Sequence, residues 1–305
     1  MKKRIILPLI LSLAFVSIQT EPAHAGFLKT YKAQISKNKE YKNTREDVKK
    51  VFEKQDEYTN SHNLEKLSEL YSEDFVNTDG FGKKVYFQLI KDTWDTYSDI
   101  IYSTVIRDIQ IDGDFATVQT YETALATTHE QSDTIDAFGE LRSTANSIYY
   151  LKKFGEKWKI TAEQILNEKS QLKYGDARFI KMDLTAPNMI NAGQEYTASL
   201  NIELGENESA IASIENQEII HPLDTPKEIF RQLGSQNELE RIFNANKKNI
   251  NEYATASIGI AKAVPYDETR ARVYVSGIAF LMTRVNVIPE NKYITVEEDN
   301  AQKTE

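Results

Sequence analysis

The sequence predicts an α+β protein: three helices on a curved antiparallel sheet, followed by a β-rich, sandwich-like domain with a helical insertion. From residue 44 the apolar residues recur at helical spacing, and after residue 101 they alternate with a period of two. Helices that precede an antiparallel meander are typical of α+β layer packing. After residue 25 about 280 residues remain, more than one hydrophobic core usually holds, so a second domain is expected.

The N-terminus has the three parts of a secretory signal peptide. A basic start, Met1–Arg4, precedes an apolar run, Ile5–Ile18, and the small residues Ala23 and Ala25 occupy the two positions that a signal peptidase requires. The alternative is a membrane anchor, but a run of about 14 residues is shorter than the roughly 20 that span a bilayer. We therefore expect cleavage after Ala25, no membrane span thereafter, and a periplasmic or extracellular protein.

Composition argues against several classes of function. There is no cysteine, so neither a disulfide nor a lipid-modified cysteine can form. The formal net charge is −9, and the Lys-rich residues 26–43 are interpreted as a solvated basic linker, so no nucleic-acid partner is expected. The histidines His62, His129 and His221 lie far apart in the sequence, which argues against a metal site. We expect no cofactor.

The first domain, residues 44–168, is predicted to begin with three helices. Thr44 is a capping residue with acidic side chains in the turn that follows, so the first helix is expected to start there. Asn63 is a good N-cap for the second helix. The third helix has four apolar or aromatic residues on one face: Tyr86, Ile90, Trp94 and Tyr97.

Four antiparallel strands are predicted to follow these helices. Asp112-Gly113 is a strong hairpin signal between the first two strands, and Gly155 marks the turn before the last one. Because the helices come first, they are expected to cover one face of the meander. The expected strands are residues 102–111, 115–126, 141–153 and 158–165.

Two segments of the first domain carry a family resemblance. They are Asn63-Leu64-Glu65-Lys66-Leu67-Ser68-Glu69-Leu70-Tyr71-Ser72-Glu73-Asp74-Phe75 and Phe154-Gly155-Glu156-Lys157-Trp158-Lys159-Ile160. In this order they resemble the nuclear transport factor 2-like fold, the family that includes ketosteroid isomerase, scytalone dehydratase and the SnoaL-like polyketide cyclases. The resemblance implies a cone-shaped domain over residues 44–168. It implies no single activity, because enzymes, binding modules and delivery domains share this fold.

The resemblance also implies candidate site residues. Asp79 falls where ketosteroid isomerase-like members keep a general-base carboxylate, although Asp79-Gly80 is also an ordinary turn pair. Gln55 stands at the position of an oxyanion-stabilising tyrosine, and is either a pocket-lining donor or a buried group bonded to the backbone. Tyr149 falls near a neutral carboxylic acid of those members and can donate a hydrogen bond in its place. The other residues expected to bind a ligand in the cone are Tyr58, Tyr86 and Trp94.

The second domain is predicted to span residues 174–289, with a polar junction at Lys169–Lys173. Residues 196–204 alternate most clearly, as a half-buried strand does. Two long strands, residues 253–264 and 271–287, are expected to close a β-sandwich. No specific family is recognised for this domain.

Two further segments of the C-terminal half have distinct patterns. Residues 226–233 and 238–247 have apolar residues at helical spacing and are predicted to be the helical insertion. The final residues, 290–305, are polar and acidic and are expected to form a disordered tail.

Two functions are consistent with these patterns. The first is an exported, non-catalytic two-domain protein that binds a small apolar molecule in the cone, mediates protein interactions, or both, with a homodimer as one form. The alternative is an isomerase, dehydratase or cyclase that acts on a ring substrate with Asp79 as general base. An enzyme requires a second polar group near its base in a closed pocket, whereas an interaction module has a filled cone.

Overall fold

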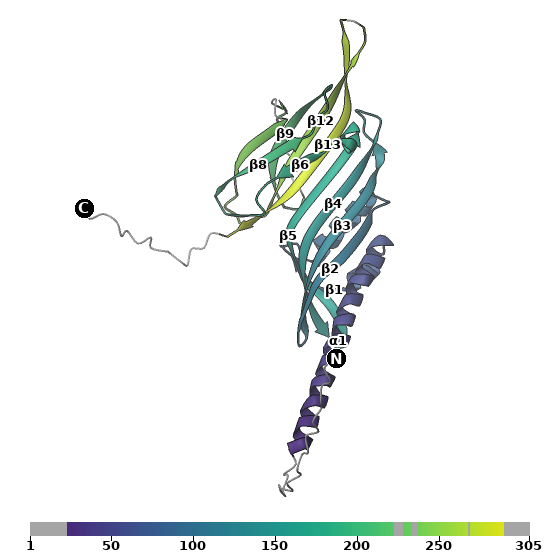
Figure 1. Cartoon of the computed structure of the whole chain (residues 1–305), viewed down its shortest axis with the longest axis vertical. Helices are drawn as coiled ribbons and strands as arrows, with labels where there is room; N and C mark the ends of the chain where they lie inside the picture. Colours follow the sequence, from purple (N-terminus) through teal and green to yellow (C-terminus); the bar gives the residue numbers. More distant parts are fainter. Residues whose placement is uncertain (1–22, 223–227, 234–236, 268, 290–305) are drawn as a thin grey trace, which may run out of the picture. The chain divides into compact units, whose positions relative to one another are not determined.

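A computed structural model describes residues 23–222, 228–233, 237–267 and 269–289 (Figure 1). The chain divides at Thr44 into two compact units, and the second, which begins at Arg45, contains all the strands described below. The predicted acidic tail, residues 290–305, lies outside the described residues. Among the described residues, no helix has an apolar stretch long enough to cross a membrane.

The first helix is longer than predicted. α1 spans Ala23–Asn60, so the helix start expected at Thr44 is wrong, and residues 26–43, expected to be a solvated linker, are helical. Residues 27–43 contain no glycine or proline and are rich in good helix formers, so nothing in them stops the helix, and a capping residue at 44 does not override this. Residues 1–22 of the expected signal peptide lie outside the described residues, and export stays a prediction.

The other two helices lie where the sequence predicts them. α2 spans Leu64–Glu69, and the Asn63 side chain caps it by accepting a hydrogen bond from the Lys66 amide at 3.0 Å. α3 spans Lys83–Thr96, and Phe87 and Trp94 are its buried residues. α3 has no side-chain cap at its first turn; its place is set by packing of its apolar face.

A curved sheet follows, and its antiparallel meander confirms the α+β prediction. β2, β3, β4 and β5 pair in order as antiparallel neighbours, while β1 pairs in parallel with β5. Gly113 and Gly155 lie in the two predicted turns with φ of 57° and 62°, a region that favours glycine. Together with α1–α3 these strands form the cone, residues 45–175. Their bounds are β1 Tyr71–Asn77, β2 Ile101–Asp112, β3 Phe115–Gln131, β4 Phe138–Phe154 and β5 Lys157–Gly175.

The sheet does not end at the predicted junction. Lys169–Lys173 lies inside β5, where it pairs with β4 on one side and with β13 (Ala271–Ile288) on the other. Four of its five residues are polar, but the segment pairs on both sides as a strand, so polarity alone did not mark a linker. In Figure 1 β13 runs beside β5. Beyond β13 the sheet continues through β12 (Glu252–Pro265), β9 (Glu208–Glu218) and β10 (Arg231–Gln232), so its strand order is β10-β9-β12-β13-β5-β4-β3-β2. Two hydrophobic cores nevertheless remain distinct, one in the cone and one beyond it.

The β-rich region, residues 176–289, adds a second sheet of order β11-β8-β6. Buried residues of β8 and β12, such as Leu200 and Ile258, belong to one core, so the two sheets face each other across it. The bounds are η1 Asp176–Phe179, β6 Met182–Thr185, β7 Met189–Asn191, β8 Glu195–Ile202, β9 Glu208–Glu218, β10 Arg231–Gln232, β11 Glu238–Asn244, β12 Glu252–Pro265 and β13 Ala271–Ile288.

The predicted helical insertion is wrong for the described residues. Residues 238–244 form β11, which pairs with β8 over its whole length. Phe243 is buried against Tyr196 of β8, and such tertiary contacts override a short helix-like pattern. Of the other predicted helix, residues 226 and 227 lie outside the described residues, and Arg231–Gln232 form β10.

Candidate functional site

A cavity of about 130 Å³ lies inside the cone, between α1, α3 and the inner face of the curved sheet. Its wall combines aromatic rings with carboxyl groups. The residues that matter for its chemistry come from six elements: Gln55 of α1, Tyr71 of β1, Tyr86 of α3, Glu122 of β3, Tyr149 of β4 and Glu163 of β5.

Strand alternation places the polar groups of this cavity. Every second residue of β3 points to the inner face of the sheet, and Val118 and Thr120 are buried there. Glu122 is the next residue on that face, and unlike its neighbours it carries a carboxyl group. Tyr149 of β4 and Glu163 of β5 are direct partners in the sheet register, and their side chains therefore lie side by side on the inner face.

Hydrogen bonds link these groups in pairs. Tyr149 Oη donates to Glu163 Oε1 at 3.0 Å, and Gln55 Nε2 donates to Tyr71 Oη at 3.1 Å. Thr120 Oγ1 donates to Glu122 Oε1 at 2.9 Å. Tyr149 and Glu163 are almost fully buried, with 2% and 6% of their surface exposed, so these contacts are formed away from bulk water.

Burial changes the ionisation of both carboxyl groups. Desolvation, followed by the nearby charge of Glu122, raises the pKa of Glu163 to about 8, while hydrogen bonds from Tyr149 and Tyr86 act in the opposite direction. Burial likewise raises the pKa of Glu122, against hydrogen bonds from Tyr149 and Thr120. Glu163 therefore holds its proton at neutral pH when no cation lies beside it.

Two buried oxygen atoms on the cavity wall lack a hydrogen-bond partner among the described residues. They are Gln55 Oε1 and Glu163 Oε2. A buried acceptor without a partner costs about 1–3 kcal/mol. Both atoms belong to cavity-lining residues, so a molecule in the cavity can supply the missing partners.

The residues predicted to bind a ligand fall into two groups. Gln55, Tyr86 and Tyr149 line the cavity. Trp94 is buried but stacks on His62, with ring centroids 4.7 Å apart, and Tyr58 lies beneath Lys66; neither ring is part of the cavity wall. Whether the lining residues bind a ligand stays a prediction.

Asp79, the predicted general base, lies in a different environment. Its carboxylate is 4% exposed and forms an ion pair with Arg284 of β13, whose Nη1 is 3.2 Å from Oδ2. Asn251 Nδ2 also donates to Asp79 Oδ1 at 2.9 Å. The following glycine, Gly80, has a φ of 79°, as the turn interpretation requires. Asp79 is not part of the cavity wall, and its charge is already neutralised.

Sequence reasoning missed Glu122, Glu163 and Tyr71. A signal was present for Glu122, which stands at an inward position of β3, in phase with the buried residue Val118. A carboxyl group at such a position is rarely tolerated unless it is paired or functional. Glu163 gave no such signal, because a register shift in β5 puts it out of phase with the buried residues Trp158 and Ile160. Tyr71 gave no comparable signal, because an aromatic residue at an inward position is usually part of the core.

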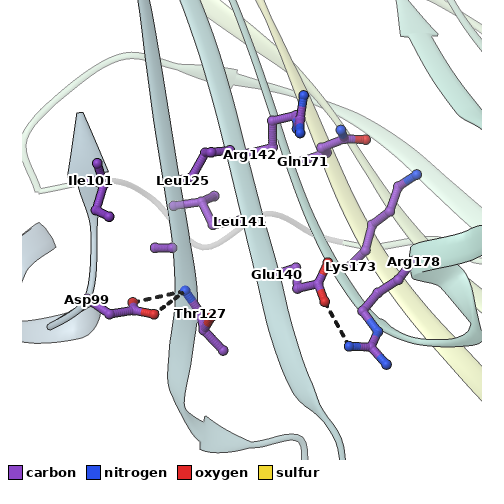
Figure 2. Close-up of a pocket in the computed structure, with 11 residues that line it drawn as sticks. Asp99, Ile101, Leu125, Thr127, Glu140, Leu141, Arg142, Gln171, Lys173 and Arg178 are labelled. Atoms are coloured by element: carbon purple, nitrogen blue, oxygen red, sulfur yellow. Dashed lines mark hydrogen bonds and ion pairs between the residues drawn. The ribbon is translucent and has the colours of Figure 1, made fainter. Parts of the chain in front are cut away.

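A second, larger depression of about 490 Å³ lies on the outer face of the same sheet. Figure 2 shows two contacts among its polar residues: Asp99 accepts from the Thr127 amide at 2.9 Å, and Arg178 pairs with Glu140 at 2.8 Å. Lys173 Nζ donates to the Ile180 carbonyl at 2.9 Å. Because these groups already have partners, the cavity in the cone is the better candidate for a ligand site.

No family model matches the sequence, and no curated protein matches it. One solved structure that is similar to this chain is a nuclear transport factor 2-like protein. This protein, from Cytophaga hutchinsonii, is 19% identical and covers 40% of this chain and 95% of its own, with a TM-score of 0.30.

Two further solved structures are similar over the same share of the chain. A conserved protein from Planctomyces limnophilus is 17% identical, covers 40% of this chain and 94% of its own, and has a TM-score of 0.35. A hexachlorocyclohexane dehydrochlorinase is 12% identical, covers 42% of this chain and 87% of its own, and has a TM-score of 0.35.

Proposed function

We propose that the cone binds one small molecule and that the protein is a binding protein rather than an enzyme. The observation that supports this is the pair of buried oxygen atoms on the cavity wall, Gln55 Oε1 and Glu163 Oε2, that lack a hydrogen-bond partner among the described residues. The cavity of about 130 Å³ is close in size to an engineered cavity of roughly 150 Å³ that holds benzene. A molecule with one ring and at least one hydrogen-bond donor fits both features, which refines the apolar ligand expected from the sequence.

The test is a panel of single-ring compounds, namely benzyl alcohol, benzylamine and benzoate, measured by thermal shift and by ligand-observed NMR. We expect at least one to raise the melting temperature, because a ligand that binds only the folded state stabilises it. Ile90→Trp, which fills the cavity, should abolish this effect. Ile101→Trp, on the exposed outer face, is the matched control. Loss of binding in Ile101→Trp alone would assign the ligand to the outer depression instead.

An acid–base enzyme acting on a ring substrate is the second candidate, and one observation favours it. Glu163 has a pKa of about 8 beside Tyr149, so it can accept and return a proton near neutral pH. In this alternative Glu163, rather than Asp79, is the base. It predicts deuterium uptake from D₂O at the acidic C–H of 2-cyclohexenone, measured by mass spectrometry and lost in Glu163→Gln. No uptake above the buffer rate argues for the binding protein.

We also propose that the protein acts outside the cytoplasm, on the strength of its N-terminal sequence pattern. Mass spectrometry of the secreted or periplasmic protein should find Gly26 as its first residue. A chain that still begins at Met1 in the membrane fraction would contradict this proposal.

For the β-rich region we propose contacts with protein partners, a second copy of the chain included. The supporting observation is the end of the β12–β13 hairpin, where Tyr266 and Val273 are 72% and 64% exposed. Light scattering should find a homodimer that the double substitution of Tyr266→Ser and Val273→Ser converts to a monomer. A monomer in the wild type at high concentration would contradict self-association.

A further inference from the structure

We infer that the ligand of the cone is a small organic cation, with an ammonium group held by Glu122 and Glu163 and its apolar part packed against the tyrosine rings. This inference rests on the proposed function, because it names the chemical class of the molecule in the same cavity. The cavity wall provides three independent arguments: its charge, its hydrogen-bonding capacity and its aromatic surface.

The charge of the wall has one sign. Three acidic residues, Asp56, Glu122 and Glu163, line the cavity, and none of its described lining residues is basic. Asp56 is engaged, since it accepts from the Thr104 amide at 3.0 Å and from its hydroxyl at 2.6 Å. The other two carboxyl groups have only hydroxyl partners, and a buried carboxylate requires a cation for full compensation.

The hydrogen-bonding capacity of the wall matches a donor-rich group. Gln55 Oε1 and Glu163 Oε2 have no hydrogen-bond partner among the described residues, and only 6% of the surface of Glu163 is exposed. Once Glu163 has released its proton, both atoms are acceptors without a donor. An ammonium group carries up to three N–H donors and no acceptor. It can therefore satisfy both atoms and form charge-assisted hydrogen bonds, which are about twice as strong as neutral ones.

The aromatic surface suits the remainder of such a ligand. Tyr71 and Tyr86 face each other with ring centroids 5.7 Å apart, and both rings line the cavity together with Tyr149. The negative faces of aromatic rings attract cations and accept apolar groups equally well. An anion would meet both acidic side chains and the negative ring faces, so this wall discriminates against it.

Binding of a cation must be coupled to release of a proton. When no cation lies beside it, Glu163 keeps its proton, because burial and the charge of Glu122 raise its pKa to about 8. The other groups that face it are the hydroxyls of Tyr149 and Tyr86 and, more distantly, the carboxyl group of Glu168. A cation in the cavity favours the ionised form, so the pKa falls and the proton leaves to solvent. Affinity therefore rises with pH up to about 8.

The experiment compares three probes of nearly equal size by isothermal titration calorimetry on the full exported chain: benzylamine, benzyl alcohol and benzoate. At pH 7 we expect benzylamine to bind roughly tenfold or more tightly than benzyl alcohol, the ratio expected for one charge-assisted hydrogen bond. Benzoate should not bind. Titrations in buffers of different ionisation enthalpy should show proton release at pH 6.5 and little at pH 9.

Two variants sharpen this comparison. Glu163→Gln should weaken benzylamine roughly tenfold, abolish the proton release and leave benzyl alcohol nearly unchanged, because the amide keeps the shape but carries no charge. Glu140→Gln, on the outer face of the sheet, is the matched control and should change neither. If Glu163→Gln fails to fold, the three-probe comparison and the proton count on the wild type decide the question alone.

The outcomes separate this inference from the proposed function. Equal affinity for benzylamine and benzyl alcohol, tighter binding of benzoate, or an absence of proton release would overturn the cationic ligand while the cone remained a binding site. Failure of all three probes to bind would overturn the proposed function itself.

Discussion

Two places in this molecule bury similar polar groups with opposite results. In the cone, Glu122 and Glu163 lie beside Tyr149 in the cavity wall. Where β13 joins β5, Asp79 and Glu168 lie near Tyr253, whose hydroxyl donates to Glu168 Oε2 at 3.0 Å. Each place therefore has two buried carboxyl groups and one tyrosine.

The difference between them is one arginine. Arg284, with a fully buried side chain, pairs with Asp79 and lies 3.9 Å from Glu168, and its Nε donates to Asn286 Oδ1 at 2.8 Å. We call the cluster of Asp79, Glu168, Tyr253 and Arg284 the Arg284 junction; it is distinct from the segment Lys169–Lys173. At the Arg284 junction the buried charges compensate each other, which ties the β1–α3 turn of the cone to β13. The cone contains no such cation among its described lining residues, so its acids are compensated by protons or by a ligand. The same residue types are thus structural in one place and available in the other.

The largest effect is expected from removing that arginine. Arg284→Met leaves Asp79 and Glu168 buried without a cation, and we expect the free energy of unfolding to fall by about 4 kcal/mol. Urea denaturation measures this loss. Lys181→Met, which breaks an exposed pair with Glu203, is the control and should leave the unfolding midpoint unchanged. A loss for Arg284→Met no larger than for the control would mean that the Arg284 junction is not a buried ion pair.

The second effect separates the Arg284 junction from the cone. Asp79→Asn keeps most hydrogen-bonding geometry but removes the charge that faces Arg284, and we expect a loss of about 3 kcal/mol in the free energy of unfolding. The affinity of the cone for benzylamine should not change, because Asp79 is not part of the cavity wall. Calorimetry on the folded variant tests this. Weaker binding with unchanged stability would restore Asp79 as a site residue.

The third prediction concerns pH and the cone alone. Burial holds the pKa of Glu163 at about 8 in the folded protein, above the ordinary value of 4.5 that applies when the chain unfolds. The stability that neutral Glu163 contributes is therefore complete below pH 4.5, where the group is protonated in the folded and the unfolded chain. This contribution is lost as the pH rises through about 8. Glu163→Gln cannot ionise, so it should match the wild type at pH 5.

At pH 9 the same variant should have a larger free energy of unfolding than the wild type, since the wild type then buries a charge beside Glu122, Tyr149 and Tyr86. Denaturation at the two pH values measures the difference. Glu122 and Glu168 also have raised pKa values, so the wild type keeps part of its pH dependence in the variant. Parallel pH curves for the two proteins would show that Glu163 ionises normally.

The contrast between the cone and the Arg284 junction also explains what the sequence could reveal. The helices and the meander follow from local patterns, and Asn63 caps α2 because a cap depends on residues three positions apart. Gln55 and Tyr149 line the cavity because strand and helix periodicity sets which face a residue occupies.

Long-range partners leave no such local pattern. Asp79 and Arg284 lie 205 residues apart in the sequence, and either one alone resembles an ordinary surface charge. Residues 169–173 were predicted to join two domains because they are largely polar. They lie inside β5, and a strand that is partly exposed to solvent can have the same composition as a loop. Residues 238–244 became β11 because β8 offered a partner edge, which helical spacing within a short segment cannot reveal.

The smallest expected effect tests the cone with two adjacent residues of one strand. Tyr149 points inward and donates to buried Glu163, whereas Tyr150 points outward, is 39% exposed and donates to Gln164 at 3.1 Å. Tyr149→Phe should lower the free energy of unfolding by about 1 kcal/mol, because Glu163 Oε1 then becomes a buried acceptor without a donor. Tyr150→Phe should change it by less than about 0.5 kcal/mol, because water replaces the lost bond.

Chemical denaturation of both variants at pH 7 measures the difference, and addition of benzylamine should then recover part of the loss in Tyr149→Phe only. Equal losses in the two variants would mean that the inner face of β4 is as solvated as its outer face, and that the acids of the cone are not sealed from water.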